Sequence, residues 1–240
     1  MSELGNSIKA EQLIVFSDNN LIVACKEPGL PTVPLKKNIN QDCLLNRLSK
    51  IYPELKDSYS EKYWEGSAVH RLDNATSGLV LFARNKEFYH YLIKLQNEDR
   101  IIKTYCALCD CTLTDETHIS EVLSAGYIES YFKSYGRKGM YVKPVFDVKK
   151  ADCDRMYRTD YEAKLSDGYC FTCRITRGFR HQIRTHLSYL GFPIKGDNLY
   201  NPLLNKDNVY KPIQLMLSCT EISVPDPDKK NSDMTFKLHQ

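Results

Sequence analysis

The sequence predicts an α+β fold in a single domain spanning residues 1–240, with its core at about residues 13–225. Predicted strands and helices follow one another without the regular alternation of a doubly wound parallel sheet. The 240 residues contain neither an internal repeat nor a low-complexity linker, and a chain of this length can bury one sizeable core. The polar, proline-punctuated segments before residue 13 and after about residue 225 are expected to be dispensable.

Residues 21–26 predict the first strand, because apolar side chains fall on one side of it. Those side chains are Leu21, Val23 and Cys25. A turn is expected at residues 27–31, which contain two prolines and a glycine. Asp42 is then expected to cap a helix that has leucines and an isoleucine at helical spacing and ends before Pro53.

The next expected elements are a buried strand and an amphipathic helix. The strand is predicted by the apolar run at residues 78–83. Residues 86–98 predict the helix, because apolar residues recur at helical spacing between charged ones. Its apolar face is expected to consist of Phe88, Tyr91, Leu92 and Leu95. Later in the chain we expect strands at residues 101–111 and 169–175 and a helix at residues 181–190, with a glycine just past its end.

Composition restricts the class of protein. The N-terminal residues lack the apolar run of a secretory signal, and no stretch approaches the roughly 20 apolar residues of a membrane span. Nine cysteines without a secretory segment favour reduced thiols over a disulfide framework. We therefore expect a soluble, cytoplasmic protein without a membrane partner, and a monomer, although no sequence feature determines the oligomeric state.

Residues 131–150 concentrate basic and aromatic side chains, whereas the formal net charge of the chain is only +3. Cations that bind phosphates and rings that stack on bases are typical of nucleic-acid binding. An exposed loop kept soluble by its charge is an equally good interpretation. The basic residues are Lys133, Arg137, Lys138, Lys143, Lys149 and Lys150, and the aromatic ones are Tyr131, Phe132, Tyr135 and Tyr141.

Two clusters of reactive residues are candidates for a functional site. The first, HRLDNATSG at residues 70–78, places Asp73 in a loop before a buried strand, where a rigid scaffold can present a carboxylate to a ligand. Alternatively, Asp73 merely caps a turn. The second, TRGFRHQIRTHL at residues 176–187, places arginines and histidines where a helix begins, which favours anion binding. Arg184, one turn into that helix, can face a buried carboxylate; the alternative is a solvated helix face.

The two clusters resemble the signature segments of the RluA-type pseudouridine synthases, whose patterns are close to HRLDxxTSGLLLxAK and HQIRxHLxxLGxPIxGDxxY. The first pattern is matched at residues 70–73, 76–79 and 84, and the second at residues 181–184, 186–187, 190–191, 193–194, 196–197 and 200. Further matches at residues 20–32 and 103–108 extend the resemblance from about residue 18 to residue 200. The resemblance implies a pseudouridine synthase-like catalytic domain with a mixed, largely antiparallel central sheet flanked by helices and loops. Because the resemblance begins at about residue 18, we expect no N-terminal S4-like RNA-binding domain.

The resemblance further implies an RNA pseudouridine synthase that isomerises specific uridines in ribosomal or transfer RNA, with RNA as its partner and no cofactor. Asp73 corresponds to the catalytic carboxylate, Tyr105 to the tyrosine that stacks on the target base, and Arg184 to the arginine that pairs with the aspartate. Arg71 corresponds to the arginine that enters the RNA as the base leaves. We expect Ile183 and Leu72 to pack the pocket. The expected RNA-binding residues are His70, Arg71, Thr76, Lys133, Arg137, Lys138, Arg180 and His181.

Arg184 is expected to keep Asp73 ionised, because an opposite charge nearby favours the charged form of a buried group. Whether Asp73 attacks the base, attacks C1′ or removes a proton stays open. The family usually has Gly-Arg-Thr before HQIR, whereas this chain has Gly178, Phe179 and Arg180, so the arginine is displaced by one position.

Two other interpretations were weighed against this one. A non-catalytic RNA-binding or folding factor on the same scaffold is disfavoured by the intact signature residues, and hydrolysis of a glycoside normally needs a second carboxylate. The pairs Cys106 and Cys109, and Cys170 and Cys173, have zinc-like spacing. Because both pairs lie in expected strands, where residues three apart point to opposite faces, we expect no metal site.

Overall fold

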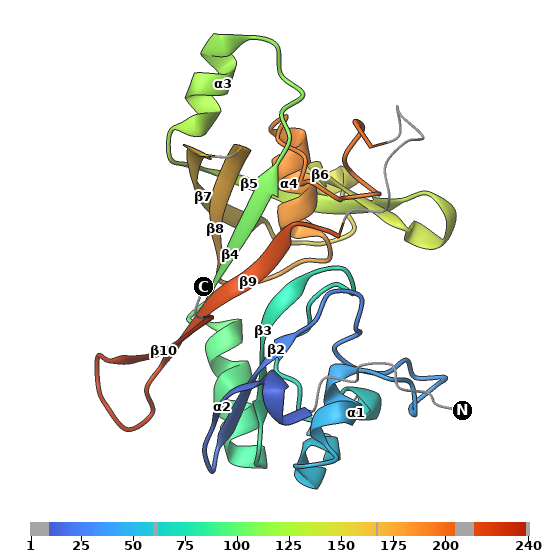
Figure 1. Cartoon of the computed structure of the whole chain (residues 1–240), viewed down its shortest axis with the longest axis vertical. Helices are drawn as coiled ribbons and strands as arrows, with labels where there is room; N and C mark the ends of the chain where they lie inside the picture. The colour runs from blue at the N-terminus through green and yellow to red at the C-terminus, as the bar shows by residue number, and fades with distance from the viewer. Residues whose placement is uncertain (1–9, 60–61, 167, 205–213, 239–240) are drawn as a thin grey trace. The chain divides into compact units, whose positions relative to one another are not determined.

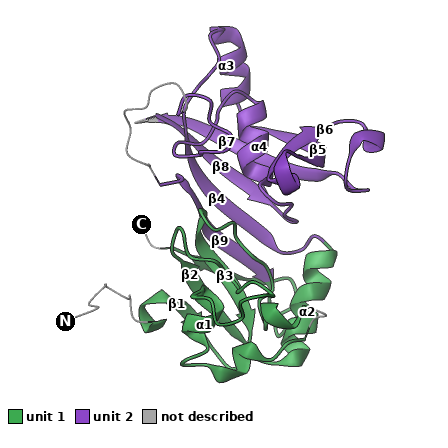
Figure 2. Ribbon diagram, turned by 90° about the vertical axis from the view of Figure 1, so that its right-hand side faces the viewer, with its two compact units in different colours: residues 1–98, 225–240 green, residues 99–224 purple. Residues whose placement is uncertain are grey.

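The computed structural model describes residues 10–59, 62–166, 168–204 and 214–238 (Figure 1). The chain divides into two compact units, residues 1–98 with 225–240 and residues 99–224 (Figure 2). Each unit combines helices with antiparallel strands, so the predicted α+β class is confirmed. That both units work as one catalytic domain stays a prediction.

The first unit contains the neighbouring antiparallel strands β1 (Ile14–Ser17), β2 (Leu21–Lys26) and β3 (Ser77–Ala83). The register between β2 and β3 runs from Leu21 opposite Ala83 to Lys26 opposite Gly78. Both predicted strands are confirmed, but the burial of β2 is not one-sided, because residues 21–24 are all fully buried. An apolar run of this kind is typical of a strand covered on both faces. The loop that enters β3 is therefore attached to a rigid element.

Helix α1 (Leu44–Leu48) is shorter than the sequence predicts and has a different cap. The predicted cap, Asp42, is wrong: Cys43 precedes the helix, and its Sγ accepts a hydrogen bond from the Asn46 amide at 3.4 Å. Asp42 instead binds Arg47 through two hydrogen bonds of 2.9 and 2.7 Å. A charge-assisted, two-bond contact with a guanidinium is stronger than a cap to one amide, which explains the exchange.

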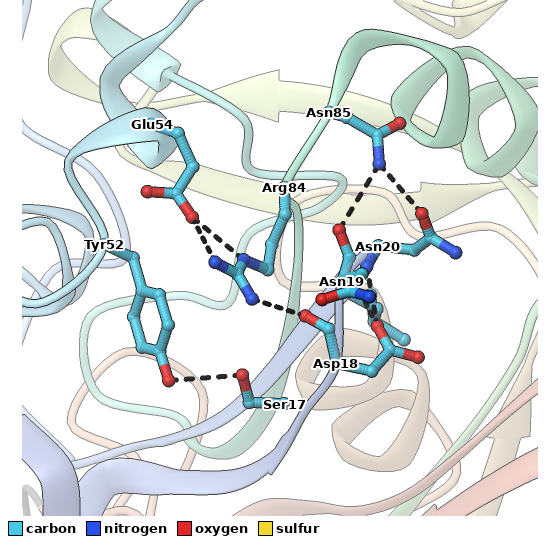
Figure 3. A network of polar contacts seen from close by, with 9 residues as sticks. Ser17, Asp18, Asn19, Asn20, Tyr52, Glu54, Arg84 and Asn85 are labelled. Atoms are coloured by element: carbon cyan, nitrogen blue, oxygen red, sulfur yellow. Dashed lines mark hydrogen bonds and ion pairs between the residues drawn. The ribbon is translucent and has the colours of Figure 1, made fainter.

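Helix α2 (Lys86–Asn97) is confirmed and begins at Asn85, whose side chain accepts a hydrogen bond from the Phe88 amide at 2.9 Å. Its buried face includes Tyr89, whereas the predicted Tyr91 is half-buried and donates its hydroxyl to the Pro225 carbonyl. Figure 3 shows how the preceding residue, Arg84, anchors the end of β3. Its guanidinium donates to Glu54 at 2.9 and 2.7 Å and to the Asp18 carbonyl at 2.6 Å.

The core of the first unit extends beyond the predicted end near residue 225. Strand β10 (Asp233–Lys237) follows, and its Phe236 is buried with its ring 5.0 Å from that of Phe16. The segment after residue 225 thus contributes a strand and a buried ring to this unit, whereas its dispensability stays a prediction. Single turns of 3-10 helix occur in both units at Ala10–Leu13, Pro53–Lys56, Tyr63–Glu65, Arg137–Gly139 and Val148–Lys150.

The second unit is built on strands that lie in an order different from their order in the chain. In the order in which they pair they are β9 (Leu217–Pro225), β4 (Ile102–Cys109), β8 (Gly168–Ile175), β7 (Tyr157–Ser166), β5 (Gly126–Tyr135) and β6 (Tyr141–Val145). All these neighbours pair antiparallel. The helices are α3 (Glu116–Leu123) and α4 (Gln182–Tyr189). Strands β4 and β8 and helix α4 confirm the predicted elements of this half.

The basic stretch at residues 131–150 is not the simple exposed loop of the alternative interpretation. Strands β5 and β6 form an antiparallel hairpin in which Tyr131 pairs with Val145 and Tyr135 with Tyr141. Side chains alternate along it, with Phe132 and Val142 buried and Lys133 and Lys143 exposed. Charged residues are thus presented on an ordered surface.

The cysteine pairs with zinc-like spacing lie in strands, as predicted. Cys106 and Cys170 are half-exposed, whereas Cys109 and Cys173 are buried, so each pair is divided between the two faces of the sheet. Within the described ranges, no group of three or more His, Cys, Asp and Glu side chains is arranged to hold a metal ion. None of the helices in the same ranges is both long and apolar enough to cross a bilayer.

Candidate functional site

Asp73 lies in the loop that leads into β3, and a buried lysine fixes the residue beside it. Lys26, at the end of β2, is fully buried. Its ammonium donates to the carbonyl oxygens of Glu27 at 2.9 Å, Leu30 at 2.7 Å and Asn74 at 3.0 Å. One cation therefore ties the turn after β2 to the loop that carries Asp73. Sequence reasoning gave Lys26 no role; the only signal was its place within the matched residues 20–32.

Lys26 also supplies a positive charge to Asp73. Burial lowers the pKa of Lys26 to about 8, while the negative charge of Asp73 acts in the opposite direction and favours the ammonium form. Lys26 and Asp73 thus carry opposite charges that attract each other. The sequence had predicted Arg184 as the cation for this purpose, and the structure adds a second within the first unit.

The backbone on both sides of Asp73 is held by further hydrogen bonds. The Gly29 amide donates to the Asn74 carbonyl at 2.7 Å, from a backbone with φ of +81° that favours glycine. The Thr32 hydroxyl accepts from the Leu72 amide at 3.1 Å and donates to the Leu72 carbonyl at 3.3 Å. The Thr76 amide donates to the Asp73 carbonyl at 3.0 Å and closes a turn. The loop is thus rigid at the residue predicted to be catalytic.

The other predicted residues of this loop differ in exposure. The His70 ring accepts a hydrogen bond from the Leu81 amide at 3.3 Å, which holds the loop against β3. Leu72 and Thr76 are buried, which suits the predicted packing role of Leu72 but favours a structural role for Thr76 over an RNA contact. Arg71 is 54% exposed and lies 3.0 Å from a Glu65 carboxylate oxygen. Among these four residues, Arg71 is therefore the best placed to reach a large ligand.

In the second unit, Arg184 forms a buried ion pair with Asp197. The guanidinium donates from Nε to Oδ2 at 2.8 Å and from Nη2 to Oδ1 at 2.7 Å, and the two side chains are 6% and 0% exposed. Asp197 also accepts from the amides of Leu199 at 2.9 Å and Tyr200 at 3.2 Å. This geometry fixes the plane of the guanidinium. Asp197 was matched in the sequence pattern but was given no role; the predicted pairing of Arg184 with Asp73 stays a prediction.

Tyr105 and Ile183, the other predicted site residues of this unit, are both buried. Tyr105 is 6% exposed and lies on β4 opposite Cys173 of β8 and Cys219 of β9. Ile183 is 5% exposed in the first turn of α4, beside Arg184. Both are consistent with the lining of an apolar pocket, and their predicted contacts with a base are proposals.

Tyr200 connects the start of α4 to the hairpin. Its hydroxyl oxygen accepts from the Val142 amide at 2.9 Å and shares a hydrogen bond of 2.8 Å with His181 Nδ1. The Arg184 guanidinium lies 5.2 Å from the centre of the Tyr200 ring. Burial raises the pKa of Tyr200 to about 12, so the phenol stays neutral. His181, a predicted RNA contact, is thus held by Tyr200, whose ring also contacts Arg184.

His186 is a buried, neutral residue. Its two ring nitrogens lie 2.9 Å from the hydroxyls of Ser130 and Thr159. Burial lowers its pKa to about 3. Its ring stacks on Phe132, with centroids 5.0 Å apart. His186 therefore joins α4 to β5 and β7 and has no charge to offer a substrate at neutral pH.

The departure at residues 178–180 has a structural explanation. Phe179 stacks on Phe132 with ring centroids 4.7 Å apart and meets the Tyr157 ring edge-on at 5.1 Å. The displaced Arg180 donates from Nη2 to the carbonyl of Gly139 at the tip of the hairpin. A half-buried aromatic residue thus packs against the hairpin at Phe132, while the arginine binds the hairpin tip. The predicted RNA contact of Arg180 stays a prediction.

Comparisons with known proteins agree with these features. The family model described as RNA pseudouridylate synthase matches residues 20–189. Ribosomal large subunit pseudouridine synthase D of Borreliella burgdorferi is 28% identical over 216 residues, which are 88% of this chain and 60% of that protein. An uncharacterised RNA pseudouridine synthase of Mycoplasma capricolum is 31% identical over 212 residues, 84% of this chain and 62% of that protein. The chain thus spans about three fifths of the length of these relatives.

A solved structure shows the same fold. Human RNA pseudouridylate synthase domain containing 1 superposes with a TM-score of 0.68 over 95% of this chain and 82% of its own, at 19% sequence identity. At this identity the likeness concerns the fold, and roles of individual residues rest on the motifs.

Proposed function

Because the chain belongs to the RNA pseudouridylate synthase family, we propose that it isomerises uridine in RNA to pseudouridine with Asp73 as the essential carboxylate. The observation that carries this proposal is the support of Asp73, in a loop fixed by the buried Lys26 on one side and by Thr32 on the other. A side chain that must meet a substrate with fixed geometry requires such a support.

The reaction sets the requirements for the other residues. The bond from C1′ to N1 of uridine breaks, the base turns, and a bond from C1′ to C5 forms, while the C5 proton leaves and N1 gains a proton. No electrons are exchanged with another molecule, so no redox cofactor is required. The target nucleotide must leave its stack, which favours a ring such as Tyr105 against the base and a planar cation such as Arg71 in the vacated position.

Asp73 acts at the sugar-base junction, either as a nucleophile or as a base. Each of these roles requires an ionised carboxylate, and the Lys26 ammonium supplies an opposite charge to it. We further propose that Arg184 approaches Asp73 with a guanidinium plane set by Asp197. Ile183 and Leu72 supply apolar walls that hold the base.

Ribosomal RNA is the first substrate to test, because one of the relatives is named as a synthase of the large ribosomal subunit. Transfer RNA is the second. The proposed RNA contacts outside the base pocket are exposed or half-exposed cationic and polar residues, namely His70, Arg71, Lys133, Arg137, Lys138, Arg180 and His181.

The proposal is tested by mapping pseudouridine in total RNA from three strains: one with the gene, one without it, and one with Asp73→Ala. We expect particular sites to disappear from both altered strains. Sites that disappear without the gene but persist with Asp73→Ala would contradict the catalytic assignment and point to a non-catalytic RNA-binding factor. If no site changes in either strain, the proposed activity itself is wrong.

A further inference from the structure

The hairpin of β5 and β6 has two different faces. Its inner face is anchored by Phe132, which stacks on Phe179 and His186, and by the Val142 amide, which donates to Tyr200. Its tip is braced by Arg180 at Gly139. The outer face of its paired part, residues 131–135 and 141–145, presents the exposed side chains of Lys133, Tyr135 and Lys143, and neither range contains an acidic residue.

Two cross-strand pairs occupy this outer face. Lys133 lies directly opposite Lys143, and both side chains are exposed. Like charges directly opposite each other on a sheet repel, so the pair is unfavourable for the free protein. The contact of the Lys143 ammonium with the Tyr135 ring, at 5.7 Å, offsets part of that repulsion. An anion bound between the two lysines would remove it.

The second pair consists of tyrosines. Tyr135 lies opposite Tyr141, and their rings stack at 5.3 Å with planes 26° apart. Tyr135 is 44% exposed, in spite of the cost of leaving a large ring in water. The tyrosine pair and the lysine pair are two residues apart along each strand, which is about 7 Å. A phosphate and the base of an adjoining nucleotide can therefore reach both pairs at once.

Resting on the proposed function, we propose that Lys133, Tyr135, Tyr141 and Lys143 form a platform that binds a single-stranded RNA segment flanking the target uridine. The lysines hold a phosphate, and the tyrosine pair stacks on an unpaired base. Stacking on aromatic side chains together with cationic contacts to the backbone is the usual mode of single-strand binding. A duplex needs the lysines alone, because its base faces are covered, and it would leave the exposed rings unexplained.

The platform is tested by fluorescence anisotropy with two labelled probes, an oligouridine of about 12 nucleotides and a blunt RNA duplex of the same length. Tyr135→Ala with Tyr141→Ala should weaken oligouridine binding by about 5- to 150-fold and change duplex binding little. Tyr135→Phe with Tyr141→Phe keeps the rings and should restore binding. Lys133→Gln with Lys143→Gln should reduce the slope of log affinity against log salt by about 0.7, because the two lysines hold one phosphate.

A matched control is Lys149→Gln with Lys150→Gln, which removes the same charge from exposed residues outside the platform. In this control background, Tyr135→Ala with Tyr141→Ala should weaken oligouridine binding by the same factor as in the wild-type background. Circular dichroism of each variant establishes that the hairpin is folded. Wild-type protein that does not bind the oligouridine, or alanine variants that are folded and bind it like wild type, would overturn the platform.

The proposed function is tested separately, by measuring pseudouridine formation with the same purified proteins. Wild-type protein that forms pseudouridine in RNA, together with tyrosine variants that bind oligouridine normally, refutes the platform and leaves the activity standing. Wild-type protein that forms no pseudouridine but shows the binding contrast refutes the activity alone. Equal losses for both RNA probes in the tyrosine variants would assign the surface to duplex RNA. Binding to anionic phosphatidylserine vesicles is measured as well, and a loss confined to these vesicles would assign the surface to a membrane. Either result contradicts the single-strand proposal.

Discussion

The Asp197→Asn substitution is expected to destabilise the protein by about 3–5 kcal/mol, because it leaves the buried Arg184 guanidinium without this charged partner. Arg184 and Asp197 are only 6% and 0% exposed, so water cannot replace the lost carboxylate. Asparagine keeps one oxygen to accept from the amides of Leu199 and Tyr200, so the change removes the charge and the hydrogen bond from Arg184 Nε to Oδ2. The loss is a large fraction of the about 5–15 kcal/mol by which folded domains are stable.

The chain contains a matched control for this prediction. Asp42 binds Arg47 through the same two guanidinium nitrogens, at 2.9 and 2.7 Å, but the Asp42 side chain is 65% exposed. Because solvent screens exposed ion pairs, Asp42→Asn should cost at most about 1 kcal/mol. The two substitutions thus share chemistry and contact geometry; they differ in burial and in that Arg47 keeps Glu27 as a second partner at 2.8 Å.

The assay is urea unfolding followed by circular dichroism, with the midpoint and slope fitted for wild type and both variants. We expect a large decrease of the midpoint for Asp197→Asn and a small one for Asp42→Asn. Equal decreases, or a loss below about 1 kcal/mol for Asp197→Asn, would refute the view that burial makes this ion pair energetically important.

Three further substitutions test buried polar groups. Burial lowers the pKa of Lys103 from 10.5 to about 8. Lys103→Met should therefore raise the free energy of unfolding by about 3 kcal/mol at pH 7, and this gain should shrink as pH rises from about 8 towards 10.5. Urea midpoints at pH 7 and 10 that show a constant gain would contradict this. Burial lowers the pKa of His186 from 6.5 to about 3, so the free energy of unfolding of the wild type should fall by up to about 5 kcal/mol as pH falls through that range. His186→Gln should reduce this dependence on pH. The same decrease of the urea midpoint with falling pH in both proteins would count against it. Tyr200→Phe removes the acceptor of the buried Val142 amide and should cost about 1–3 kcal/mol, a prediction that an unchanged thermal unfolding midpoint would exclude.

Elements with strong local patterns were predictable from the sequence. The apolar runs of β2 and β3 and the helical spacing in α2 and α4 placed these elements within one or two residues of their observed ends. The end of the chain was not predictable in this way, because Phe236 is a lone aromatic residue in a polar segment, and its burial, which includes contact with the distant Phe16, depends on tertiary structure. The Asp42 cap was not predictable either, because the Asp42 side chain binds the Arg47 guanidinium instead of a helix amide.

The residues of the candidate site were found from their types and spacing, but their supporting partners were not. Lys26 and Asn74 are 48 positions apart, and nothing in the local pattern indicates that a lysine at a strand end will turn inward and bind three carbonyls. Arg184 and Asp197 are closer in sequence, yet the pairing depends on how the segment after α4 folds back. Partners of this kind are set by tertiary structure, which a pattern of residue types does not contain.

The central claim is that the carboxylate at position 73 is required for the reaction. Purified wild-type protein and Asp73→Asn are incubated with total RNA from cells that lack the gene, and pseudouridine formation is followed in time at the affected sites. We predict that the asparagine variant, folded as judged by circular dichroism, is slower by at least about a hundredfold. A variant that keeps about a tenth or more of the wild-type rate would contradict the account.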